Sequence, residues 1–251
     1  MEPIRLERIT KTFTTHSTDV VIKGTQRPAV TRTVLRELNM EIPVGKLTVI
    51  VGRSGCGKST LLRLINGDVK QDSGEIHLPH GFRSSLLSAD PYVITWTSVL
   101  RNIAMAAGAG QTPEERIEQA EKLLRLVRLE KYSDLTPAEL STGMRQRLGL
   151  ARVLASRSQI LLMDEPFASL DFITREELQK ELLAIQAKDP RTILLVTHQL
   201  EEALLMAEYI VVMHEDSSIE HFDLTHLAYP RDLLCEELLA LRAAVTEACR
   251  R

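Results

Sequence analysis

A glycine-rich segment between an apolar run and a helical pattern constrains the fold of this chain more than any other feature. The run Leu47–Val51 reads LTVIV, which is typical of a strand buried on both faces. The next residues match GxxxxGK[ST], and Leu61, Leu62 and Ile65 follow with helical spacing. The segment consists of Gly52, Arg53, Ser54, Gly55, Cys56, Gly57, Lys58, Ser59 and Thr60. Strand, loop and helix therefore occur in the order that a phosphate-binding loop requires.

Such a loop binds phosphate mainly through its backbone. Glycines let main-chain N–H groups converge on phosphate oxygens, and the helix that follows directs its positive end at the same charge. We expect Lys58 to neutralise the β- and γ-phosphates and the Ser59 hydroxyl to bind Mg²⁺. The chain is therefore predicted to bind a nucleoside triphosphate together with Mg²⁺.

Three more short apolar runs, at residues 160–163, 193–196 and 210–213, resemble the first one. Helical patterns lie between most of them, which indicates crossover connections between parallel strands. The predicted fold class is α/β, a phosphate-loop nucleotide-binding fold with a mainly parallel sheet and helices on its faces.

The flanking segments complete the predicted organisation. Residues 4–42 alternate apolar and polar side chains around a polar stretch at residues 14–32, which predicts an antiparallel N-terminal β layer with a long loop. Residues 91–154 are largely helical in pattern. We expect one domain over residues 1–251, with a core at about 1–90 and 155–251 and a helical subdomain at about 91–154.

The sequence predicts the starts of two helices. Thr112 precedes a proline and Glu115, which together predict an N-cap, a first-turn proline and a capping box. Thr174 and Glu177 repeat the spacing ahead of a second amphipathic pattern, so Thr174 is the predicted cap there.

Two adjacent carboxylates, Asp164 and Glu165, end the apolar run at residues 160–163. A nucleotide site on a parallel sheet places a metal-linked acid at such a strand end, and we expect Asp164 to hold Mg²⁺ through water. Successive strand residues face opposite ways, so Glu165 is free to polarise the water that attacks the γ-phosphorus.

Composition excludes several classes of protein. With 31 basic and 34 acidic side chains and a formal charge of −3, no global field draws the chain to nucleic acid, which we do not expect as a partner. Cys56, Cys235 and Cys249 are too scattered for a disulfide framework or a zinc site. No apolar run approaches the roughly 18 residues of a spanning helix, so we expect a cytoplasmic protein, held at a membrane only by a partner.

A segment shortly before the acidic strand carries a family resemblance. Residues 140–147 read LSTGMRQR and resemble the ABC signature LSGGQxQR, with Thr142 and Met144 as departures. The resemblance continues through residues 164–171, DEPFASLD, and 196–198, VTH, so it spans essentially the whole chain. From the sequence, Ser141 should also cap the helix that begins here.

The resemblance implies how the site is divided. In ABC ATPases two domains pair head to tail, and the signature of one covers ATP held by the other. It implies that Ser141, Thr142, Gly143 and Met144 contact the partner's nucleotide and that Asp171 lies along the dimer seam. The second subunit is either an identical or a different ABC ATPase.

The resemblance also assigns roles to two side chains that contact opposite ends of the nucleotide. His198 corresponds to the switch histidine that contacts the γ-phosphate and orders Glu165, and Phe13 corresponds to the aromatic that stacks on adenine. A structural histidine and a core phenylalanine are the alternatives.

Residues 96–103, 167–175 and 229–232 resemble the nitrate, sulfonate and taurine importer ATPases. That resemblance implies an integral membrane permease and a periplasmic or lipid-anchored solute-binding protein as partners, with the chain at the inner face of the membrane. One departure stands out, because Ala89 occupies the position where this group has the Q-loop glutamine. Asp90 is the candidate substitute.

Two other functions remain open at this point. A soluble ABC ATPase of DNA repair, translation or cluster assembly uses the same motor, although this chain has neither a second motor domain nor a long coiled-coil insertion. A regulatory subunit that binds ATP with weak hydrolysis is favoured by Ala89 and disfavoured by Glu165 and His198.

Overall fold

A computed structural model of the chain describes residues 2–15, 30–108 and 111–251, so most of the loop predicted within residues 14–32 lies outside the described residues. Its central element is a six-stranded sheet in the order β5-β6-β7-β3-β8-β9, parallel except for the β8–β9 pair. These strands are β3 (Leu47–Val51), β5 (Ser84–Leu87), β6 (Ile160–Asp164), β7 (Thr192–Val196), β8 (Tyr209–Met213) and β9 (Ile219–Asp223). The predicted α/β class is confirmed.

The continuous apolar runs reflect burial on both faces of this sheet. On β3, Val49 and Val51 contribute to one hydrophobic cluster, while Ile50 between them contributes to another. Strands with this double burial carry no polar face, which is why their sequences show no alternation.

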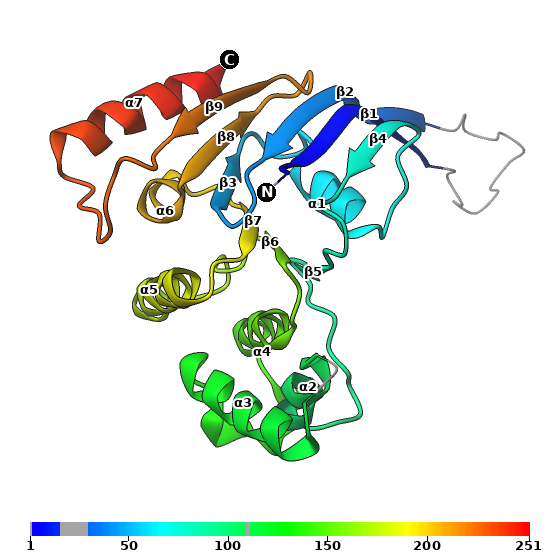
Figure 1. Ribbon diagram of the computed structural model, residues 1–251, viewed down its shortest axis with the longest axis vertical. Coiled ribbons are helices and arrows are strands. Elements are labelled where there is room, and N and C mark those ends of the chain that lie inside the picture. Colours follow the sequence, from blue (N-terminus) through cyan, green and yellow to red (C-terminus); the bar gives the residue numbers. More distant parts are fainter. Residues whose placement is uncertain (1, 16–29, 109–110) are drawn as a thin grey trace, which may run out of the picture.

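A second, three-stranded antiparallel sheet covers one side of the molecule (Figure 1). It has the order β2-β1-β4, from β1 (Ile4–Thr15), β2 (Val30–Ile42) and β4 (Ser73–His77). The predicted N-terminal layer is confirmed, with β4 as an additional strand that the sequence analysis did not identify. Its apolar side chains share one cluster with those of α1 (Lys58–Asn66).

The other helices lie on the opposite side of the central sheet or below it (Figure 1). The lower group comprises α2 (Val99–Ala106), α3 (Pro113–Leu126), α4 (Thr142–Ala155) and the short turns η1 (Glu130–Tyr132) and η2 (Pro137–Glu139). The others are α5 (Phe172–Lys188), α6 (Leu200–Met206) and α7 (Glu236–Arg250). Among the described residues, none of these helices has the length and apolar character needed to cross a membrane.

The two predicted helix starts had different outcomes. Thr112 caps α3 in a capping box with Glu115, as predicted. The prediction of Thr174 as a cap was wrong, because α5 begins earlier and its N-cap is Asp171, whose carboxylate accepts a hydrogen bond from the Thr174 N–H at 3.0 Å. Aspartate and threonine are both favourable N-cap residues, and here the aspartate accepts the hydrogen bond from the free N–H at the helix start.

One buried amide holds the lower group of helices together. Asn102 of α2 is fully buried, and its Oδ1 accepts hydrogen bonds from the Ile94 N–H and from Arg152 of α4, both at 2.7 Å. Its Nδ2 donates to the carbonyl oxygens of Ile94, Thr97 and Ser98. A single side chain therefore ties the loop after β5 to the signature helix α4.

Replacing Asn102 with alanine should destabilise the protein without weakening ATP binding. The change leaves the Arg152 guanidinium and several backbone groups without partners, which costs about 2–4 kcal/mol of the free energy of unfolding. Urea denaturation measures this loss, with Glu118→Gln on the exposed face of α3 as a control that stays near the parent value. A midpoint for Asn102→Ala equal to that of the parent would contradict this role.

Candidate functional site

The sheet register brings the predicted loops together at one edge. In the parallel ladder Ile50 of β3 and Asp164 of β6 both pair with Val196 of β7, so the residues after these three strands emerge side by side. They surround a cavity of about 570 Å³. It is lined by Phe13, Arg32, Val34, Gly52, Ser54, Gly55, Gly57, Lys58, Ser59, Thr60, Glu165, Val196 and His198.

At two glycines of the phosphate-binding loop, a side chain would clash with neighbouring atoms. Gly57 has φ 107°, and a Cβ there would lie 2.6 Å from the Leu35 Cδ2. A Cβ on Gly52 would overlap the carbonyl oxygen of Met213. Gly57 also caps α1 without a side chain, so the first N–H groups of that helix have no side-chain acceptor and point to the cavity.

The side chain of Lys58 is positioned to bind an anion. Its side chain is buried, and Nζ donates hydrogen bonds to the carbonyl oxygens of Gly52 and Arg53, both at 2.8 Å. The neutral carbonyls hold the ammonium in place beneath the loop, and phosphate oxygens are stronger acceptors for the same group because they are charged.

Asp164 and Ser59 form a set of oxygen donors suited to Mg²⁺. Asp164 is only 9% exposed, and burial raises the pKa of its carboxyl. A hydrogen bond with Ser59 and the charge of Lys58 act in the opposite direction. A desolvated carboxylate gains from a cation, and Mg²⁺ prefers hard oxygen ligands such as these, so the residues fit the predicted metal.

Glu165 faces His198 across the cavity. Its Oε2 lies 3.0 Å from Nδ1 of His198. Glu165 has φ 50°, in the left-handed region, and its N–H donates to the Val196 carbonyl at 2.9 Å. A non-glycine residue held there costs on the order of 1 kcal/mol. This turn, rather than the strand alternation used in the prediction, accompanies the placement of Glu165 beside His198.

Several predicted residues do not line this cavity. The Arg53 side chain points to solvent, 4.0 Å from Glu215, and the Cys56 Sγ is buried 3.7 Å from the Lys58 Nζ. Ala89 and Asp90 are exposed and absent from the cavity wall. The role of Asp90 as a substitute for the glutamine stays a prediction.

The signature residues also lie outside the cavity. Ser141 is the N-cap of α4, and its hydroxyl accepts from the Met144 N–H at 3.3 Å, as predicted. A Cβ on Gly143 would come within 3.0 Å of the Ser169 carbonyl oxygen, so the start of α4 abuts the loop before Asp171. Neither Thr142 nor its signature neighbours line the wall around Lys58.

Sequence reasoning missed three residues of the cavity wall, Arg32, Val34 and Val196. Arg32 pairs with Phe13 across the β1–β2 ladder and donates through Nη2 to the Gly55 carbonyl at 3.2 Å. The register of a hairpin follows from its turn, and a long polar segment separates these strands, so no local signal identified the residue opposite Phe13. Phe13 itself is partly exposed and faces the cavity rather than the core.

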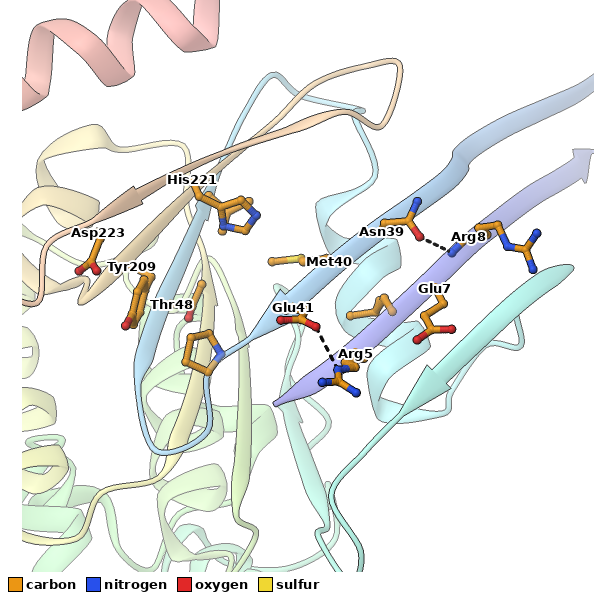
Figure 2. Close-up of a pocket in the computed structure, with 13 residues that line it drawn as sticks. Arg5, Glu7, Arg8, Asn39, Met40, Glu41, Thr48, Tyr209, His221 and Asp223 are labelled. Atoms are coloured by element: carbon orange, nitrogen blue, oxygen red, sulfur yellow. Dashed lines mark hydrogen bonds and ion pairs between the residues drawn. The ribbon is translucent and has the colours of Figure 1, made fainter. Parts of the chain in front are cut away.

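A larger cavity of about 770 Å³ lies between the two sheets and contains none of the predicted site residues. Figure 2 shows its charged rim, where Arg5 pairs with Glu41 at 3.0 Å and the Arg8 N–H donates to Asn39. Arg5 and Glu41 form an ion pair with each other there, and no helix N-terminus is among the lining residues. The smaller cavity is therefore the candidate site.

Several known proteins resemble this chain in sequence. The family profile described as "ABC transporter" matches residues 35–168. The taurine import ATP-binding protein of Pseudomonas aeruginosa is 40% identical over 192 residues, covering 72% of each chain. The aliphatic sulfonates import ATP-binding protein of Agrobacterium fabrum is 38% identical, covering 76% of this chain and 74% of the relative. The nitrate import ATP-binding protein of Synechococcus elongatus is 36% identical, covering 78% and 74%.

A solved structure resembles the fold as well. It is a dimer of an ATP-binding cassette in a post-hydrolysis state with ADP and Pi, with a TM-score of 0.74 and 25% sequence identity. The match covers 88% of this chain and 98% of that one.

Lys58→Ala should abolish ATP binding. Each charge-assisted contact that is lost contributes about 1.5–3 kcal/mol, and the ammonium reaches more than one phosphate oxygen. Titration calorimetry with ATP checks this, and Lys70→Ala, an exposed lysine beyond α1, is the matched control that keeps the parent affinity. Unchanged affinity in Lys58→Ala would rule out the cavity as the phosphate site.

Proposed function

Because this chain belongs to the ABC transporter family and hydrolyses ATP, we propose that it works as a head-to-tail dimer that drives a separate membrane permease. The cargo proposed is a small anion such as nitrate, a sulfonate or taurine. The observation that carries the proposal is the division of residues: the phosphate loop, Glu165 and His198 share one cavity, while the signature residues lie outside it.

The relatives support the direction and cargo of transport. Their names describe import of taurine, aliphatic sulfonates and nitrate, all small molecules with an anionic group. The proposal accordingly includes a permease, a periplasmic or lipid-anchored solute-binding protein, and a location at the cytoplasmic face of the membrane. Nucleic acid has no part in it.

The binding half of the mechanism uses the phosphate loop. Lys58 exchanges its two carbonyl acceptors for β- and γ-phosphate oxygens, and the N–H groups at the start of α1 bind the same phosphates. Ser59 and Asp164 would hold Mg²⁺, which would neutralise charge on the phosphates. Phe13 stacks on the adenine at the mouth of the cavity.

The hydrolytic half uses the Glu165–His198 pair. Glu165 accepts a proton from water as that water attacks the γ-phosphorus and the bond from this phosphorus to the β–γ bridging oxygen breaks, which releases ADP and phosphate. His198 holds the carboxylate at 3.0 Å and contacts the γ-phosphate. Positioning accounts for most of the catalysis of phosphoryl transfer, so the strained turn at Glu165 serves the chemistry.

The second subunit completes the site. Ser141 and the Gly143 N–H cover the partner's γ-phosphate, Thr142 and Met144 flank them, and Asp171 lies along the seam. ATP closes the dimer, and hydrolysis reopens it.

The helical subdomain, residues 91–154, transmits closure to the permease. Tyr92 and Trp96 are 86% and 84% exposed, and they lie in the same loop as Ala89. Large exposed apolar side chains indicate a surface that another protein covers. Asn102 fastens their loop to α4, so a permease at this loop moves the signature helix with it.

One observation favours a second candidate, an ATP-binding regulatory subunit with weak hydrolysis. Ala89 carries no amide, and the segment around it stays out of the cavity. No feature of the described residues specifically favours the other alternative, a soluble non-transport ATPase.

Glu165→Gln should leave ATP binding nearly intact and slow hydrolysis by roughly 10²–10⁴-fold, the range typical of losing a general base. The trapped species should be an ATP-bound dimer. Phosphate release and gel filtration measure both effects, with Glu176→Gln on the exposed side of α5 as control. Turnover at the parent rate would remove Glu165 from the mechanism.

Ala89→Gln should increase the ATPase rate of the isolated protein by roughly 10-fold, because the added amide orients water and metal once dimer closure brings this segment to a site that works by positioning. Ala89→Leu adds similar volume without the amide and should have no such effect. A parent rate of several per second, unchanged in Ala89→Gln, would show that the missing glutamine does not limit turnover.

A further inference from the structure

A buried ionic network lies behind the loop that carries His198. Glu202 of α6 is only 4% exposed, and its Oε2 accepts a hydrogen bond from the Thr197 hydroxyl at 2.6 Å. The same hydroxyl accepts from the Gln199 N–H at 3.0 Å. The residues on both sides of His198 are therefore fixed through one carboxylate.

Arg175 of α5 reaches this network from the other direction. Its Nη1 donates to Oε1 of Gln199 at 2.7 Å, and its Nε lies 3.8 Å from Oε1 of Glu202. Its Nη2 donates to the carbonyl oxygen of Leu170 at 3.0 Å. One planar guanidinium thus joins residues 197–199 to the peptide group that precedes Asp171.

The carboxylate at the centre of this network is buried. Burial raises the pKa of the Glu202 carboxyl, and the Thr197 hydrogen bond and the Arg175 charge oppose that rise. A buried carboxylate without its cation is unfavourable, so Glu202 holds Arg175 in place. Arginine also suits the geometry, because its fixed fork of donors can serve two loops at once, whereas a lysine ammonium cannot do so in one plane.

We propose that Arg175 is a positioning residue that couples the loop at residues 167–171 to the loop at residues 197–199, so that a shift of Asp171 at the dimer seam moves His198. Glu202 anchors Arg175, and Gln199 is the acceptor through which Arg175 acts. The proposal rests on the proposed function, in which Asp171 lies at the seam and His198 orients Glu165.

The test compares Arg175→Ala and Gln199→Ala with the parent in the full chain. A displacement of about 1 Å at a catalytic group lowers turnover by up to about 10²-fold, so kcat should fall by roughly 10- to 100-fold. The ATP dissociation constant should stay within about twofold, because neither residue lines the cavity. Arg242→Ala is the matched control, since this exposed arginine pairs with Glu201 of α6 at 2.7 Å without contacting either loop.

The decisive readout is the same substitution in a His198→Ala background. If Arg175 acts through His198, Arg175→Ala causes no further loss of kcat there, whereas a merely structural role gives the same loss in both backgrounds. An unchanged kcat in the single variants, or an equal loss with and without His198, overturns the proposal. Should Arg175→Ala fail to fold, Gln199→Ala carries the test, because it leaves Glu202 paired.

A parallel measurement of Glu165→Gln separates this proposal from the one on which it rests. If Glu165→Gln hydrolyses ATP at the parent rate, the proposed function fails. If Glu165→Gln is slow while Arg175→Ala and Gln199→Ala are not, only the coupling through Arg175 fails.

Discussion

The parallel pairing of β7 with both β3 and β6 is the constraint on which the rest of the site depends. Because Ile50 and Asp164 share Val196 as a pairing partner, the phosphate loop, the acidic turn and the His198 loop leave the sheet at one edge. A shift of one residue in either ladder would exchange the two faces of a strand and carry Asp164 away from Ser59. Burial of β3, β6 and β7 on both faces fixes this register, so the apolar core also aligns the catalytic groups.

Sequence reasoning predicted the parts of this structure that depend on local chemistry. The four buried strands have continuous apolar runs, the loop after β3 has its glycines, and Thr112 and Ser141 have the spacing of caps. The edge strands β4, β5 and β9 were not predicted, because they are short and partly exposed and β5 begins with two serines. Residues that depend on long-range pairing were equally hidden, as Arg32 opposite Phe13 illustrates.

Two details of the site depend on backbone geometry that no sequence pattern reports. Glu165 turns toward His198 through a positive φ just after the strand ends, which the strand alternation used in the prediction does not report. Asp171 was assigned to a seam by resemblance, and it is also the cap of α5. Its carboxylate accepts hydrogen bonds from Thr174 at the helix start, and these hydrogen bonds and the charge of Arg147 lower its pKa. Arg175 connects the peptide group before Asp171 to Gln199, next to His198, so these parts form one connected region.

The central claim is that each ATP site is shared between the phosphate loop of one subunit and the signature of another. Cross-linking tests it most directly, in a background with Cys56, Cys235 and Cys249 replaced by serine. One chain carries Ser54→Cys, the other carries Ser141→Cys, and a short bifunctional maleimide joins thiols that lie close together. The account predicts a covalent dimer only when both chains are mixed and ATP is present with EDTA, and none after Lys58→Ala. Equal cross-linking with and without ATP, or no cross-linking between these positions, would contradict it.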